Sequence, residues 1–135
     1  MKSKSRVLHF LRHGAHDRSE DGRHPGGGLT ILGRQQSHCA AAYLKQLPIE
    51  VIYSSDHELY VAHGNLIRSL VVLALKVRPQ YHWTTFQAYN CSLTTFVVGS
   101  KRSVHISTVN NLAYLPLELV SQDSAGDDVF QPAGG

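Results

Sequence analysis

Two histidines of this chain each stand between a short apolar stretch and a glycine, and one of them follows an arginine. His13 comes after Arg12 and residues 7–11, and His63 comes after residues 59–62. A neutral imidazole nitrogen can attack phosphorus and form a phosphoramidate, which splits one difficult transfer into two easier steps. A guanidinium grips two phosphoryl oxygens at once and stays charged. The pattern therefore indicates phosphoryl-transfer chemistry at Arg12 and His13.

The glycines that follow these histidines favour the same chemistry. Gly14 and Gly64 carry no side chain, so their backbone amides can approach an anion closely. Gly64 also opens an apolar helix, whose first amides and dipole attract a phosphate. The predicted catalytic residues are His13, His63 and Arg12, and the predicted phosphate-binding residues are Arg12, Gly14, Gly64 and Asn65.

The elements that would hold these residues alternate between strand and helix. The expected strands cover residues 7–11, 51–53, 59–62, 92–98 and 103–109, and the expected helices cover 30–46 and 65–76. Thr30 is a good N-cap, and the second helix is apolar nearly all round, which predicts burial on several sides. This alternation predicts an α/β fold with a mostly parallel sheet and an antiparallel pair at one edge. Such sheets bind ligands at the carboxyl ends of their strands, so His13 and His63 are expected to meet at one rim.

Size and composition exclude several other classes of protein. The chain has 135 residues and a net charge of +3 with its nine histidines counted as neutral, and its basic residues are scattered. These values predict one soluble domain and argue against nucleic-acid binding, which needs a clustered basic face. No apolar stretch approaches the ~20 residues of a membrane span. We expect Cys39 and Cys91 to be free buried thiols rather than a disulfide or part of a zinc site.

Four motifs in a fixed order resemble the histidine phosphatase superfamily, whose members resemble phosphoglycerate mutase. The motifs are LRHG at 11–14, LTILGRQ at 29–35, IYSS at 52–55 and HGNLIR at 63–68. Further similarity at Trp83, at NCSLT over 90–94 and at Leu115-Pro116 is typical of the phosphoglycerate-mutase-like serine/threonine protein phosphatases, some of which are mitochondrial.

This resemblance implies a three-layer α/β sandwich with a mostly parallel sheet, here incomplete. The domain would cover residues 6–118, and residues 119–135 would form a C-terminal tail. The resemblance also implies that His13 is the phosphorylated nucleophile, that Arg12 is a phosphate ligand and that His63 lines the same pocket. Members of the family need no metal for the step, and we expect no cofactor.

The resemblance breaks after Asp56. Family members continue there with a helix that bears a second pocket arginine and with a long excursion that bears the general acid, whereas the chain passes at once from His57 into the later strand. Either the protein has lost this segment or the sequence leaves it out. The second interpretation is favoured, because a crossover between parallel strands normally takes a dozen or more residues. Asp17, in the polar loop after His13, is the best substitute for the missing acid.

Two functions from different classes follow from these residues. The first is a phosphatase that hydrolyses a phosphomonoester, in a small molecule or a phosphoprotein, through phosphohistidine at His13. The alternative is a catalytically impaired pseudophosphatase that binds a phosphorylated ligand or a protein. A metal site of His9, His13, His16 and His24 is disfavoured, because a spacing of four along a strand separates the first two. The sequence leaves a homo-oligomer open and fits a cytoplasmic or a mitochondrial location.

Overall fold

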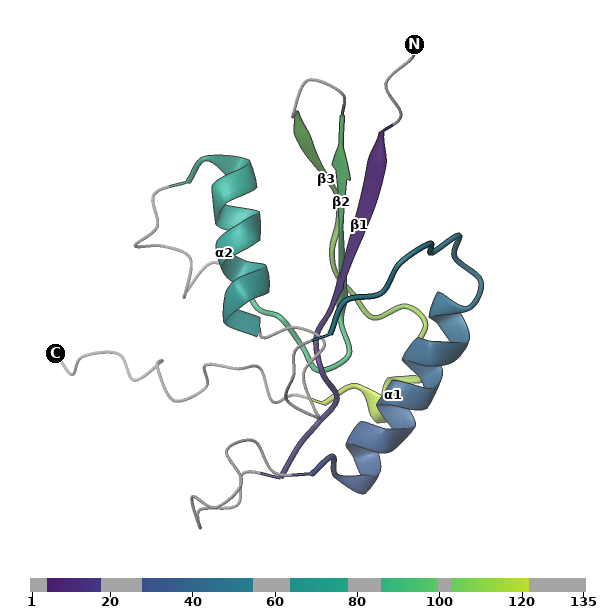
Figure 1. Ribbon diagram of the computed structural model, residues 1–135. Helices are drawn as coiled ribbons and strands as arrows, with labels where there is room; N and C mark the ends of the chain where they lie inside the picture. Colours follow the sequence, from purple (N-terminus) through teal and green to yellow (C-terminus); the bar gives the residue numbers. More distant parts are fainter. Residues whose placement is uncertain (1–4, 18–27, 55–63, 78–85, 100–102, 122–135) are drawn as a thin grey trace, which may run out of the picture.

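The computed structural model describes residues 5–17, 28–54, 64–77, 86–99 and 103–121. These residues contain three strands, two α-helices and one short 3₁₀-helix (Figure 1). In chain order they are β1 (Arg6–Leu11), α1 (Ile31–Leu44), α2 (Gly64–Leu75), β2 (Leu93–Val98), β3 (Val104–Asn111) and η2 (Leu117–Leu119). The α/β class and five of the predicted elements are therefore confirmed.

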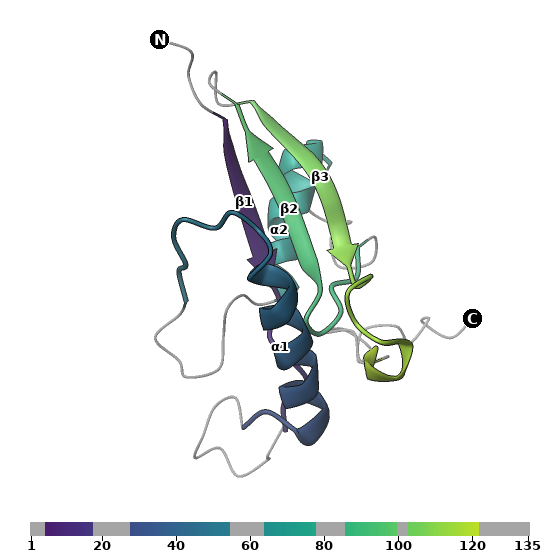
Figure 2. The same cartoon turned by 90° about the vertical axis from the view of Figure 1, so that its right-hand side faces the viewer.

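The three strands form one antiparallel sheet in the order β1-β2-β3. Arg6 pairs with Val98 at one end of β1, and Leu11 pairs with Leu93 at the other. Four successive residues of the central strand, from Leu93 to Phe96, are buried. Because successive side chains of a strand point to opposite faces, both faces of β2 are covered. The two helices accordingly lie on opposite sides of the sheet (Figures 1 and 2).

The mostly parallel sheet is not what the described strands form. Every described pairing is antiparallel. Residues 51–53, predicted as a strand from their β-branched and aromatic side chains, lie outside any strand, and Tyr53 is 84% exposed. That prediction is wrong, because strand propensity reflects packing on a neighbouring strand and no described strand pairs with these residues. The other predicted parallel strand, at 59–62, and the junction at 56/57 lie outside the described residues.

The two helices match their predicted positions but not all of their predicted burial. The Thr30 hydroxyl accepts a hydrogen bond from the Gly33 amide at 3.0 Å, which confirms Thr30 as the N-cap of α1. In α2 one side is buried, but Leu66 and Leu73 are exposed, so the expected burial on several sides is wrong. Neither helix in the described part of the chain has the length and apolar character needed to cross a membrane.

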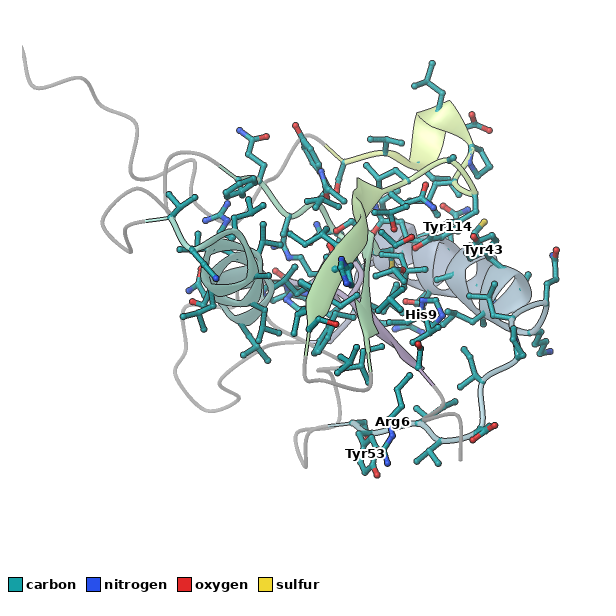
Figure 3. The ribbon with its side chains drawn as sticks, turned by 90° about the horizontal axis from the view of Figure 1, so that it is seen from above. Arg6, His9, Tyr43, Tyr53 and Tyr114 are labelled. Carbon is teal, nitrogen blue, oxygen red and sulfur yellow. The ribbon has the colours of Figure 1, made fainter. Side chains whose placement is uncertain are left out.

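The core between α1 and the sheet joins distant parts of the chain. Ala40, Cys91 and Leu115 form its buried centre. Tyr43 of α1 stacks on Tyr114 with ring centroids 4.7 Å apart (Figure 3). The Tyr114 hydroxyl donates to the Cys91 carbonyl. Both cysteines are free thiols, as predicted, although Cys39 is only partly buried.

The predicted domain boundary lies beside a contact with α1 and stays a prediction. That boundary, between residues 118 and 119, falls inside η2. The Leu119 carbonyl accepts a hydrogen bond from Gln36 at 2.7 Å, so the chain is still held to α1 at this point. Residues 122–135 lie outside the described part.

Candidate active site

The segment that follows β1 is clamped to the segment that precedes β2. Arg12 donates its backbone amide to the Ser92 carbonyl, and Cys91 donates its amide to the His13 carbonyl, both at 3.0 Å. Both side chains are buried, with Arg12 3% and His13 7% exposed. The sequence predicts these residues at the end of an apolar strand, but β1 itself is exposed to half-buried. Residues about 80 positions later hold Arg12 and His13 in place.

The His13 ring is oriented by its own neighbour in the chain. Its Nδ1 lies 2.8 Å from the Gly14 carbonyl oxygen. A carbonyl oxygen only accepts hydrogen bonds, so Nδ1 carries the hydrogen and Nε2 of the neutral ring carries the lone pair. The ring is thereby set in the tautomer in which Nε2 is the nucleophilic nitrogen.

Arg12 is held by the main chain of the segment before β2. Its Nη1 donates to the Ala88 carbonyl. A guanidinium has five N–H donors in a rigid fork, so this bond orients the group while engaging one of them. The structure therefore shows a buried cation, oriented by the main chain, on the residue before His13. The phosphate-binding role of Arg12 stays a prediction.

Gly14 and Gly33 let the loop after β1 lie directly on the first turn of α1. A Cβ at position 14 would come within 2.5 Å of the Gly33 carbonyl oxygen, and a Cβ at position 33 within 1.9 Å of the Ala15 carbonyl oxygen. Real Cβ atoms do not approach backbone so closely, so either substitution must push the two segments apart. Gly14 thus has a packing role beside its predicted phosphate-binding role.

Sequence reasoning missed Gln36, which ties three segments together. Its side chain is fully buried. Its Oε1 accepts from the Ala15 amide at 2.8 Å, and its Nε2 donates to the Leu119 carbonyl at 2.7 Å. The signal was the spacing of Thr30, Gly33 and Gln36, which recur every three residues and so share one face of α1. Gln36 positions the loop that follows the candidate nucleophile.

Two short segments, one at His16 and one at Leu29, pair next to the candidate nucleophile. His16 forms an antiparallel bridge with Leu29, and the Asp17 amide donates to the Gly28 carbonyl at 3.0 Å. The His16 ring meets the His13 ring, with centroids 4.7 Å apart. Asp17, the predicted substitute acid, is exposed.

The histidines considered for a metal site are described only in part. His9 lies on β1, and its Nδ1 is 3.0 Å from the Thr95 hydroxyl (Figure 3). Burial lowers the pKa of His9 below its usual value. His24 lies outside the described residues, and the rest of the described chain contains no group of three metal-ligating side chains.

The second half of the predicted site is described only in part. His63 lies outside the described residues, whereas Gly64 is buried at the start of α2 and Asn65 beside it is exposed. The amino end of α2 lies toward the end of the sheet at which β1 ends (Figure 1). The structure thus brings Arg12, His13 and Gly14 together and leaves their meeting with His63 a prediction.

Comparison with known proteins finds a family model that matches the part of the chain that holds His13. The sequence model of the histidine phosphatase superfamily (branch 1) matches residues 8–58. The resemblance to histidine phosphatases is confirmed. This match includes β1, the Arg12-His13-Gly14 segment and α1.

Two curated relatives carry the same name. The mitochondrial serine/threonine-protein phosphatase Pgam5 of Caenorhabditis elegans is 33% identical over 64 residues, which is 47% of this chain and 22% of that protein. Its counterpart from Caenorhabditis briggsae is 33% identical over 66 residues, which is 49% of this chain and 23% of that protein. The match thus spans less than a quarter of the length of either relative.

Proposed function

We propose that this protein is a phosphatase that hydrolyses a phosphomonoester through a phosphohistidine on His13. The observation that carries the proposal is the bond between His13 Nδ1 and the Gly14 carbonyl, which directs the lone pair to Nε2. The buried Arg12 guanidinium beside it supports the same role. The names of the two relatives favour a phosphorylated serine or threonine of a protein as the substrate.

The reaction would proceed in two displacements at one phosphorus atom. Nε2 of His13 attacks the phosphoryl group, the alcohol leaves, and water then hydrolyses the phosphohistidine. Arg12 stabilises the charge on the equatorial oxygens, which is the main catalytic requirement of such transfers. Gly14, Gly64 and Asn65 would supply further donors, with His63 on the opposite wall. The proposed step uses no metal or cofactor.

The same proposal includes the finer features of the family fold. A domain over residues 6–118 would form a three-layer sandwich with a mostly parallel sheet. A mitochondrial location would match the names of the relatives, and a cytoplasmic one stays open.

A pseudophosphatase is the second candidate function. The observation that favours it is the composition of the site. The described carboxylates, Asp17, Glu50 and Glu118, are all exposed, and the sequence has no counterpart of the family's second pocket arginine. If each missing group matched one preorganised donor, the loss would be roughly 10²–10³-fold in rate apiece. This candidate predicts phosphate binding without turnover.

One set of measurements separates the two candidates. The full chain is mixed with p-nitrophenyl phosphate, and the release of nitrophenol is compared for the native protein, His13→Ala and the exposed-site control His38→Ala. A phosphatase gives turnover that His13→Ala abolishes and His38→Ala retains, with acid-labile phosphate trapped on the native enzyme. Phosphate binding without turnover supports the pseudophosphatase. Turnover that survives in His13→Ala would refute the assignment of the nucleophile.

A further inference from the structure

His16 lies three residues after the proposed nucleophile, and its ring contacts the His13 ring. The ring centroids are 4.7 Å apart and the ring planes cross at 83°. This is the edge-to-face arrangement of two aromatic rings in contact. The structure therefore places a second imidazole against the ring that would carry the phosphoryl group.

The position of His16 is fixed by main-chain bonds. It bridges to Leu29, and this bridge is flanked by the Asp17–Gly28 bond and by a 3.0 Å bond from the Thr30 amide to the Ala15 carbonyl. Thr30 is in turn the cap of α1. The segment that carries His16 is thus anchored to the amino end of α1 before any substrate binds, as a preorganised catalytic group requires.

The chemistry of the site calls for a proton-transfer group, and His16 suits that task. The alkoxide of an alkyl phosphate leaves poorly unless its oxygen is protonated. The carboxylates within the described residues are all exposed. Histidine is the side chain that most often transfers protons in enzymes near neutral pH. His16 is also less buried than His13, which suits exchange of a proton with water.

We propose that His16 is a catalytic residue, the general acid and then the general base of the reaction on His13. In the first step the ester P–O bond breaks, a P–N bond to His13 Nε2 forms, and the His16 imidazolium gives its proton to the leaving alkoxide. In the second step water adds to phosphorus, the P–N bond breaks, and neutral His16 takes the proton of that water. Phosphate is released, and both histidines return to their starting states.

This inference rests on the proposed phosphatase function and is tested by the dependence on the leaving group. His16→Gln is compared with the native full chain on p-nitrophenyl phosphate and on a phosphoserine peptide. Nitrophenolate leaves without protonation, so we expect the variant to release a first equivalent of nitrophenol within ~10-fold of the native rate. General acid–base catalysis contributes ~10²–10⁴-fold, so cleavage of the serine phosphate and hydrolysis of the phosphohistidine should slow by a factor in this range.

The measurements distinguish a failure of the role proposed for His16 from a failure of the role proposed for His13. If His16→Gln lowers the rate equally on both substrates, His16 has a packing role and not a proton-transfer role. If His16→Gln leaves the rate on the phosphoserine peptide unchanged, His16 has no role in the reaction. His38→Gln, at an exposed position of α1, should match the native protein on both substrates. If the native chain releases no first equivalent of nitrophenol, or His13→Ala still does, the proposed function itself fails and this inference fails with it.

Discussion

At the scale of single residues, a main-chain carbonyl decides the reactive form of His13. The Gly14 oxygen that accepts from Nδ1 does not titrate, so the tautomer does not depend on the protonation of a partner side chain. The packing that supports the Gly14 peptide also comes from the main chain. Two glycines, Gly14 and Gly33, let two stretches of backbone touch.

The Gly33 contact gives a prediction at this scale. Gly33→Ala places a methyl group 1.9 Å from the Ala15 carbonyl oxygen, whereas a Cβ at Gly28 meets nothing within 4 Å. Overpacking of this kind costs about 1–3 kcal/mol of unfolding free energy. We expect Gly33→Ala to be destabilised by at least that much in urea unfolding and to lose phosphate binding, while Gly28→Ala keeps both. Native stability in Gly33→Ala would contradict the close approach.

The residue types of the site were readable in the sequence, but their partners were not. Arg12 and His13 stand out because a charged residue and a histidine follow an apolar stretch. Nothing in the sequence shows that Ala88 takes the Arg12 guanidinium, because that contact joins residues 76 positions apart. His16 could not be placed against His13 either, because their contact depends on the turn between them.

At the scale of elements, α1 acts as the frame for the loop after β1. Its cap bonds to the Ala15 carbonyl, its third residue touches Gly14, and Gln36 reaches both Ala15 and Leu119. One helix face thus connects the candidate nucleophile to the last described turn. Damage to this face should therefore reach the site without any change of a catalytic group.

Gln36→Ala tests this role. The change leaves the buried Ala15 amide and the half-buried Leu119 carbonyl without the glutamine, and an unsatisfied buried group such as the Ala15 amide costs about 1–3 kcal/mol. We expect faster hydrogen exchange at the Ala15 amide and earlier proteolysis near Leu119. The neighbouring Gln35→Ala, at an exposed position, is the matched control and should behave as the native protein does. Unchanged exchange at Ala15 in Gln36→Ala would show that another group holds the loop.

Elements with strong local signals were predictable, and those that depend on partners were not. The N-cap at Thr30 and the hairpin of β2 and β3 follow from local chemistry, and both are found. The strand at 51–53 and the burial of α2 on several sides were wrong because each requires a neighbour that the local sequence does not specify. Only the arrangement of the whole chain supplies such neighbours.

At the scale of the whole molecule, the core contains two groups that must stay neutral. Burial raises the pKa of the Cys91 thiol to about 11, although the Ser37 hydroxyl and Arg12 act in the opposite direction. Burial also raises the pKa of the Tyr114 phenol. Both groups lie where α1 meets the segments around β2 and β3, so their ionisation opposes the packing of these parts.

These raised pKa values predict how the free energy of unfolding changes in the alkaline pH range. A group whose pKa is raised by folding holds its proton longer in the folded state, so its full contribution is present at low pH and is lost as the pH rises. We expect the free energy of unfolding to fall from about pH 9 to about pH 11 as the unfolded Cys91 thiol ionises first. Tyr114 should extend the fall to higher pH.

Matched cysteine variants identify the source of this fall. Cys91→Ala should flatten the curve between about pH 9 and pH 11, although the variant is less stable overall. Cys39→Ala retains the buried thiol and should keep the native slope. Urea unfolding at each pH gives the curves, and a slope unaffected by Cys91→Ala would assign the fall to other groups.

The clamp between His13 and Cys91 also determines when the candidate site can form during synthesis. Residues 13 and 91 are joined through the main chain across 78 positions, and Gln36 reaches Leu119 across 83. Translation at ~5–20 residues per second separates the emergence of the two ends of the clamp by roughly 4–16 s. Throughout that interval the nascent chain has β1 without its β2 neighbour and His13 without its support. The clamp can therefore close only after both segments have emerged, and joining segments so far apart in the sequence is intrinsically slow.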